Sequence, residues 1–196
     1  MDFTGDVIFL VDSSSEVSRE QFKKEKYFVA SLAKVLNLGP AKTRGSAITY
    51  GRYALVGIEF DDHPNPTAFE QAVDELPQIS FHRRMDKALR RSADIIKVAR
   101  ADVPKVVLLL TAGRQSPPRN TLLPSVKSLK DLGTSVFVIG IGSRPDGQEL
   151  RSIVEEPGDV LRVSTFDDFS PSRTRQIARH IVNRTGKNNI LIMCTK

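Results

Sequence analysis

The chain has 196 residues, 40% of them hydrophobic and 27% charged, with a formal net charge of +6. This length and composition are typical of one soluble globular domain with a sizeable core, and no apolar run approaches the roughly 20 residues that cross a membrane, so we expect no membrane insertion. The excess of basic residues favours acidic partners such as sulfated glycans. The simpler explanation of the positive charge is a basic surface that contacts only solvent. Because the chain has no Trp and only three Tyr, it lacks the aromatic platform of a nucleic-acid binder, and we expect no nucleic-acid partner.

The first predicted element is a strand over residues 6–11, an apolar run that stops at Asp12 and the serines Ser13, Ser14 and Ser15. A continuous run of Val, Ile, Phe and Leu this short suits a strand that is buried on both faces of a parallel sheet. Ligands of such sheets gather beyond the carboxyl ends of the strands. Asp12 and Ser14 offer the hard oxygen ligands that suit Mg²⁺ or Mn²⁺; the alternative is that the serines cap the following helix.

Helical periodicities and further apolar runs alternate along the rest of the chain, and Gly51 with Arg52 marks a hairpin between two of the runs. Strands that alternate with helices indicate a parallel sheet covered on both faces. The predicted helices are residues 18–36, 67–76, 84–100, 122–132, 148–155 and 167–183, and the predicted strands after the first are residues 46–50, 53–60, 104–111, 134–140 and 159–164.

Local signals also predict where several helices begin and end. Gly39 follows the first helix as its C-cap glycine, Thr67 is expected to cap the second helix, and Gly133 is expected to stop the helix that precedes it. The apolar positions of the helix over 84–100 run as far as Val98, which we expect to be available for burial.

Taken together, the order of elements and four segments resemble the von Willebrand factor type A family, also called integrin I-like domains. Within the family, the segments are most similar to A domains of collagen-VI-like and other matrix proteins. The segments are residues 6–14 (DVIFLVDSS), 84–89 (RMDKAL), 103–114 (VPKVVLLLTAGR) and 132–142 (LGTSVFVIGIG).

The resemblance covers nearly all of residues 5–184 within a single domain of 1–196, and it leaves 185–196 as a C-terminal tail or linker. It implies a three-layer, Rossmann-like α/β fold: a mostly parallel central sheet with one antiparallel edge strand and helices on both faces. It also implies a secreted, non-enzymatic module of the extracellular matrix that binds collagen or other matrix proteins and is part of a larger multidomain chain. The alternative is a spacer or assembly domain in a tandem array.

The family's metal-ion-dependent adhesion site (MIDAS) takes ligands from an Asp-x-Ser-x-Ser loop, a threonine and a further aspartate. Matched position by position, Asp12 and Ser14 are kept, whereas Glu16, Arg83 and Ala112 depart from the pattern. An arginine in this pocket repels a cation, and the alanine removes a carboxylate ligand. We therefore expect the residual site of Asp12, Ser14 and Glu16 to bind Mg²⁺ or Mn²⁺ weakly or not at all, so no firm cofactor is predicted. Arg83 or its neighbour Arg84 is expected to pair with Asp12 in place of the ion.

Two surface features have a functional and a plain interpretation. The basic residues Arg84, Lys87, Arg90 and Arg91 crowd one helix, where they form either a solvated face or a patch for an anionic ligand. Asn183 begins an Asn-Arg-Thr tripeptide that fits the N-glycosylation pattern, and we expect it at the exposed end of the last helix.

Reactive residues are sparse. The single cysteine, Cys194, is predicted to be either a free thiol or half of a disulfide whose partner lies outside this sequence. His63, His82 and His180 lie far apart, and no Gly-x-Ser-x-Gly elbow surrounds the serines near Asp12. We therefore expect no enzyme; a histidine beside Ser14 would contradict that expectation.

Overall fold

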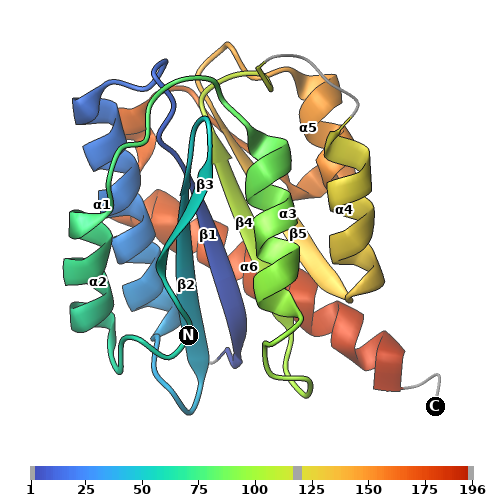
Figure 1. Cartoon of the computed structure of the whole chain (residues 1–196). Helices are drawn as coiled ribbons and strands as arrows, with labels where there is room; N and C mark the ends of the chain where they lie inside the picture. The colour runs from blue at the N-terminus through green and yellow to red at the C-terminus, as the bar shows by residue number, and fades with distance from the viewer. Residues whose placement is uncertain (1–2, 117–120, 194–196) are drawn as a thin grey trace.

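The computed structural model describes residues 3–116 and 121–193, and the side chains up to residue 186. Its centre is a six-stranded sheet of order β3-β2-β1-β4-β5-β6, in which only the pairing of β2 with β3 is antiparallel (Figure 1). This confirms the predicted mostly parallel sheet with one antiparallel edge strand. The strands are β1 (Gly5–Asp12), β2 (Thr43–Tyr50), β3 (Ala54–Ile58), β4 (Lys105–Thr111), β5 (Thr134–Ile141) and β6 (Val160–Val163).

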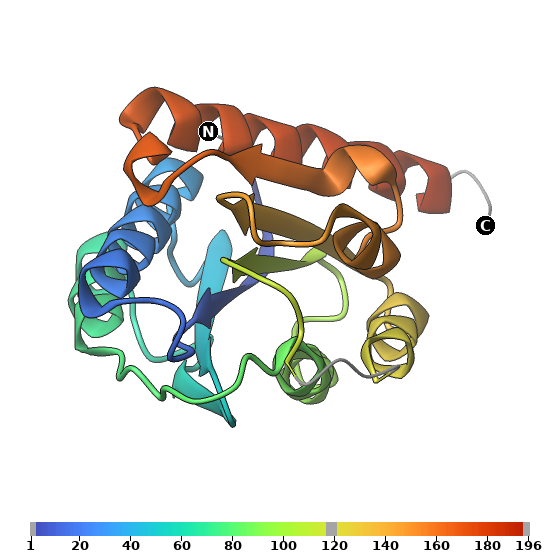
Figure 2. The same ribbon diagram turned by 90° about the horizontal axis from the view of Figure 1, so that it is seen from above.

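Helices cover both faces of this sheet, which confirms the three-layer architecture. One layer contains α1, α2 and α6, and the other contains α3, α4 and α5; from above, α6 lies along one face and α3 and α4 along the other (Figures 1 and 2). The helices are α1 (Arg19–Leu36), α2 (Pro66–Glu75), α3 (Met85–Ile96), α4 (Leu122–Asp131), α5 (Gly147–Ile153) and α6 (Pro171–Met193), with short 3₁₀ turns η1 (Pro157–Asp159) and η2 (Phe166–Asp168). None of the described helices is long and apolar enough to cross a membrane.

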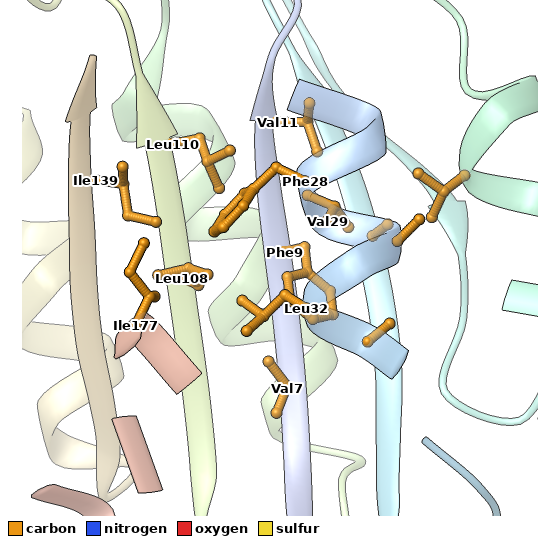
Figure 3. Packing of buried hydrophobic residues seen from close by; sticks show 14 of the residues in the cluster. Val7, Phe9, Val11, Phe28, Val29, Leu32, Leu108, Leu110, Ile139 and Ile177 are labelled. Atoms are coloured by element: carbon orange, nitrogen blue, oxygen red, sulfur yellow. The ribbon is translucent and has the colours of Figure 1, made fainter. Parts of the chain in front are cut away.

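Strand β1 shows why its sequence is a continuous apolar run. Val7, Phe9 and Val11 belong to the core under α1 and α6, whereas Ile8 and Leu10 belong to the core under α3. Successive side chains of a strand point to opposite faces, so a strand covered on both sides needs apolar residues at every position. Figure 3 shows the first of these cores, with the odd-numbered β1 residues against α1.

Two helix caps differ from the local prediction, and a third agrees with it. The left-handed cap of α1 is Asn37, with φ 55°, and not Gly39. Asparagine tolerates this conformation better than most residues, so Asn37 is the cap, and the helix ends at Leu36 as predicted. Helix α2 is capped by the side chain of Asn65, which accepts hydrogen bonds from the backbone of Thr67 and Ala68, so Thr67 is not the cap. Gly133 has φ 67° just after α4, as expected of a helix-stopping glycine.

Two helix lengths were also wrong. Helix α3 ends at Ile96, because its last turn tightens into i→i+3 bonds from Val98 to Ile95 and from Ala99 to Ile96. Val98 consequently points to solvent with 84% of its surface exposed. Helix α6 continues to Met193, well past the predicted end at residue 183, so residues 185–193 extend the last helix.

The carboxylate of Asp6 at the start of β1 is buried between two arginines. Arg44 donates from Nε and Nη2 at 3.0 and 2.8 Å, and Arg100 donates from its backbone N, Nε and Nη2 at 3.0, 3.0 and 2.7 Å. Burial alone would raise the pKa of Asp6, but these hydrogen bonds outweigh it and hold the pKa below its ordinary value.

This clamp predicts a specific loss of stability in acid. Because the folded-state pKa of Asp6 is lowered, its contribution is complete above about pH 4, the ordinary pKa, and disappears as the pH falls through the folded-state value. Asp6→Asn should lower the free energy of unfolding at neutral pH by about 1–3 kcal/mol and flatten its decline below about pH 4. Urea unfolding across this pH range measures both effects. The exposed Asp131→Asn serves as the control, and an unchanged acid slope in Asp6→Asn would contradict the prediction.

Candidate functional site

The candidate site lies at the carboxyl edge of the sheet, where three segments meet. The loop after β1 carries Asp12 to Glu16, the end of β4 carries Ala112 and Gly113, and Arg83 immediately precedes α3. Strands β1 and β4 are parallel neighbours, so their carboxyl ends lie side by side at the upper end of the sheet in Figure 1.

Asp12 is fully buried at the centre of this site, and its carboxylate accepts three hydrogen bonds. Oδ2 accepts from Arg83 Nε at 2.5 Å and from the backbone N–H of Ala112 at 3.0 Å. Oδ1 accepts from the backbone N–H of Ser14 at 3.1 Å. The oxygens that a metal ion would use are thus engaged by the protein itself.

Arg83 is completely buried, which is rare for a charged side chain. Its Nη1 donates to Glu16 Oε2 at 3.2 Å and to the carbonyl of Arg114 at 3.4 Å. Burial would lower the pKa of Arg83, but the charge of Asp12 outweighs it and keeps that pKa above its ordinary value, so the guanidinium stays charged.

Gly113 makes room for this guanidinium. A Cβ at position 113 would lie 2.3 Å from Arg83 Nη1, closer than any normal contact. The glycine of the β4 loop and the arginine before α3 therefore depend on each other, although they are separated by thirty residues of sequence.

One component of the site, Glu25 of α1, was not predicted from the sequence. Its Oε2 accepts the backbone N–H of Asp12 at 3.0 Å, and the side chain is fully buried. Burial, followed by the negative charge of Asp12, raises the pKa of Glu25 well above its ordinary value. A signal was present: Glu25 stands between Phe22 and Val29 at i+3 and i+4 spacing on the apolar face of α1, where an acid is out of place.

The serines after β1 do not cap the helix. Ser13 Oγ donates to the carbonyl of Tyr50 and Ser15 Oγ to the carbonyl of Phe81, while α1 is capped by Ser18 in a capping box with Gln21. The capping interpretation of the three serines was therefore wrong, since the chain needs further residues after β1 before it can turn into α1. Ser14 Oγ is buried and has no hydrogen-bond partner among the described residues.

Of the two neighbouring arginines, Arg83 is the one that contacts Asp12. Arg84 turns away and forms a bidentate pair with Asp86, at 2.8 and 2.7 Å. Glu16 is itself held by two arginines, since Arg144 Nη1 lies 3.4 Å from the same Oε2 that Arg83 contacts.

The basic residues of α3 differ in their surroundings. Arg84 is neutralised by Asp86, whereas Lys87 donates to the backbone carbonyl of Arg52, and Arg90 and Arg91 are exposed. The four residues are therefore not one uniform patch.

The remaining candidates lie elsewhere. Asn183 is exposed within α6 and not at its end, because the helix is longer than predicted, and Cys194 lies outside the described residues. His180 lies 3.0 Å from Asp159, and His63 packs edge-on against Phe69. No histidine in the described part of the chain bonds to Ser14.

The charges of this site can be compared with those that a divalent cation requires. Within the described ranges, no three His, Cys, Asp or Glu side chains are grouped so that they could hold a metal ion. Asp12 faces a buried guanidinium, position 112 offers only a methyl group, and Glu16 is shared between Arg83 and Arg144. These residues do not fit a bound Mg²⁺ or Mn²⁺.

The von Willebrand factor type A domain model matches residues 6–177. Von Willebrand factor A domain-containing protein 1 of Mus musculus is 30% identical over 170 residues, which are 84% of this chain and 40% of that protein. The collagen alpha-5(VI) chain of Mus musculus is 28% identical over 197 residues, which are 95% of this chain and 7% of that one.

Among solved structures, proximal thread matrix protein 1 from the mussel byssus, with a zinc-occupied MIDAS motif, aligns with a TM-score of 0.79 and 18% identity. The alignment covers 90% of this chain and 48% of that chain. The chain thus spans less than half the length of each of these relatives.

Proposed function

The chain belongs to the von Willebrand factor type A family, and on that premise we propose that it is a non-enzymatic, secreted binding module of the extracellular matrix whose MIDAS is degenerate. It engages collagen or another matrix protein without a bridging metal ion. It acts as a single A domain of a larger multidomain chain, consistent with the short share of its relatives that it covers.

The observation that supports this most is the buried pair of Arg83 and Asp12, with 2.5 Å between Nε and Oδ2. Two unit charges of the same sign about 4 Å apart repel by roughly 4 kcal/mol at an effective dielectric constant near 20. A millimolar dissociation constant corresponds to only about 4 kcal/mol of binding free energy. The repulsion from the guanidinium is therefore as large as the binding free energy of a weakly bound cation. The lack of a carboxylate at position 112 weakens cation binding further.

Binding of this domain to immobilised collagen I and collagen VI should be insensitive to chelator. We expect the same half-saturation with excess EDTA as with millimolar Mn²⁺, because no metal contributes to the contact. The measurement is a solid-phase binding curve under the two conditions, with an A domain that keeps the complete motif as the positive control. Binding abolished by EDTA would refute a metal-independent module.

Each of the two alternatives predicts a different result. Arg90 and Arg91 are exposed and could contact an anionic glycan. Saturable retention on heparin at physiological salt that is lost in an Arg90→Glu/Arg91→Glu variant would favour such a ligand. Absence of binding to every immobilised ligand would favour a spacer or assembly domain in a tandem array.

A further inference from the structure

The segment between α2 and α3 crosses the candidate site in an unusual backbone conformation. Ser80 and Phe81 have φ of 64° and 63°, a left-handed region that is sparsely populated by residues other than glycine. Hydrogen bonds hold both residues in place: Ser80 donates to the carbonyl of Ser13 at 2.8 Å, and the carbonyl of Phe81 accepts from the backbone of Ser15 at 3.0 Å. The conformation is thus imposed by the loop that carries Asp12.

The turn between β2 and β3 is fastened to the same segment. The backbone N–H of Arg52 donates to the carbonyl of Ser80 at 3.2 Å. A Cβ at Gly51 would lie 2.2 Å from that carbonyl oxygen, so only glycine permits the approach. In Figure 1 this segment runs past the tip of the β2–β3 hairpin at the upper end of the sheet.

The result of this arrangement is an exposed cluster of two aromatic rings and two cations, Arg52, Tyr53, Phe81 and Lys87, which we call the aromatic cluster. Tyr53 and Phe81 are 56% and 58% exposed. The Arg52 guanidinium lies 5.5 Å from the Tyr53 ring centre and 5.7 Å from that of Phe81, and Lys87 Nζ lies 5.3 Å from the Tyr53 ring centre. Cation–π contacts of this kind hold the charged groups over the rings.

The charge of the aromatic cluster is uncompensated within the described part of the chain. No carboxylate there forms an ion pair with Arg52 or Lys87, and the neighbouring acid, Asp86, is already paired with Arg84. Arg91, one helical turn beyond Lys87 on the same side of α3, is exposed and adds a further positive charge.

We propose that the aromatic cluster is a docking surface for an acidic segment of a partner protein that also carries an apolar side chain. The carboxylates of the partner would complement Arg52, Lys87 and Arg91, and its apolar side chain would cover the rings of Tyr53 and Phe81. Tyrosine and arginine are enriched where protein interfaces bind most strongly, and their close pairing here fits a protein partner. A sulfated glycan needs a row of cations and gains less from exposed rings. The proposal rests on the proposed function, for which it supplies a contact surface without metal.

Selection from a random dodecapeptide phage library on the intact domain tests this surface. We expect the enriched peptides to combine Asp or Glu with Leu, Phe or Trp. In fluorescence anisotropy with the strongest enriched peptide, Phe81→Ser and Arg52→Glu should each weaken binding by about tenfold or more. Matched controls lie elsewhere on the chain: Tyr27→Ser, at a tyrosine that is 60% exposed on α1, and Arg179→Glu, at an exposed arginine of α6. Both should bind as the unmodified domain does.

Each of the following outcomes would overturn the proposal: no enrichment of acidic peptides, peptides that bind the two cluster variants as well as the unmodified domain, or a heparin fragment that alone requires Arg52 and Phe81. Circular dichroism of each variant confirms that the fold is intact. If immobilised collagen still binds both cluster variants normally, the docking proposal fails and the proposed function stands. If peptides bind the cluster but no matrix protein binds the domain, the proposed function fails and the docking surface stands.

Discussion

Replacing Asp12 by alanine should lower the free energy of unfolding by about 3–5 kcal/mol, a large part of the roughly 5–15 kcal/mol that stabilises a domain. The substitution removes the carboxylate that accepts hydrogen bonds from Arg83, Ala112 and Ser14. The Arg83 guanidinium then remains buried with only the half-exposed Glu16 as a charged partner. An unpaired charge in a buried site is among the most destabilising changes that a single substitution can produce. Urea unfolding at neutral pH provides the measurement.

A double variant distinguishes the effect of leaving Arg83 without its ion-pair partner from the effect of the cavity that Asp12→Ala creates. In Asp12→Ala/Arg83→Met, neither charge is present, and replacing a buried ion pair by apolar side chains is often close to neutral. Much of the lost stability should therefore return, although the backbone N–H groups of Ser14 and Ala112 still lack their acceptor. Glu16→Ala is the matched acidic control and should change stability by about 1 kcal/mol or less, since that carboxylate is half-exposed. A double variant no more stable than Asp12→Ala would show that Arg83 is not the source of the effect.

Restoring the ligand set at the same pocket should convert this domain into a metal-binding one. In Glu16→Ser/Arg83→Thr/Ala112→Asp, the guanidinium is removed and two hydroxyl groups and a carboxylate are introduced around Asp12 and Ser14. Removing a repulsion of roughly 4 kcal/mol corresponds to about a thousandfold in dissociation constant. Isothermal titration calorimetry with Mn²⁺ should therefore show binding in the micromolar range for the triple variant and none, or only millimolar binding, for the unmodified domain.

The matched control for the restored pocket is Ala112→Asp alone. It adds the missing carboxylate but keeps Arg83, and we expect it to remain unresponsive to Mn²⁺ because the guanidinium pairs with the new acid. If this single variant bound Mn²⁺ as tightly as the triple variant, the charge of Arg83 would not be the obstacle. Micromolar Mn²⁺ binding by the unmodified domain would contradict the degenerate site altogether.

The layers of the fold were predictable because they depend on patterns that are local in sequence. The apolar run of β1 predicts burial on both faces, and Gly133 predicts the end of α4, where the structure has a left-handed φ. Where local signals compete, they failed: Asn37 ends α1 ahead of Gly39, and Asn65 caps α2 in place of Thr67. Choices between adjacent capping residues depend on differences of about 1 kcal/mol or less, which contacts with the rest of the domain easily override.

The sheet, the covering helices and the residue types at the family's metal positions could be predicted from the sequence, because strand and helix periodicity and single-residue chemistry are local properties. That Arg83 and not Arg84 reaches Asp12, 71 positions away, depends on the folded arrangement of the chain. The same arrangement brings Glu25 beneath the site and places Ser80 and Phe81 against the loop after β1. Such contacts join segments that meet only after the chain has folded, and their energies are set by burial and geometry that no short stretch of sequence contains.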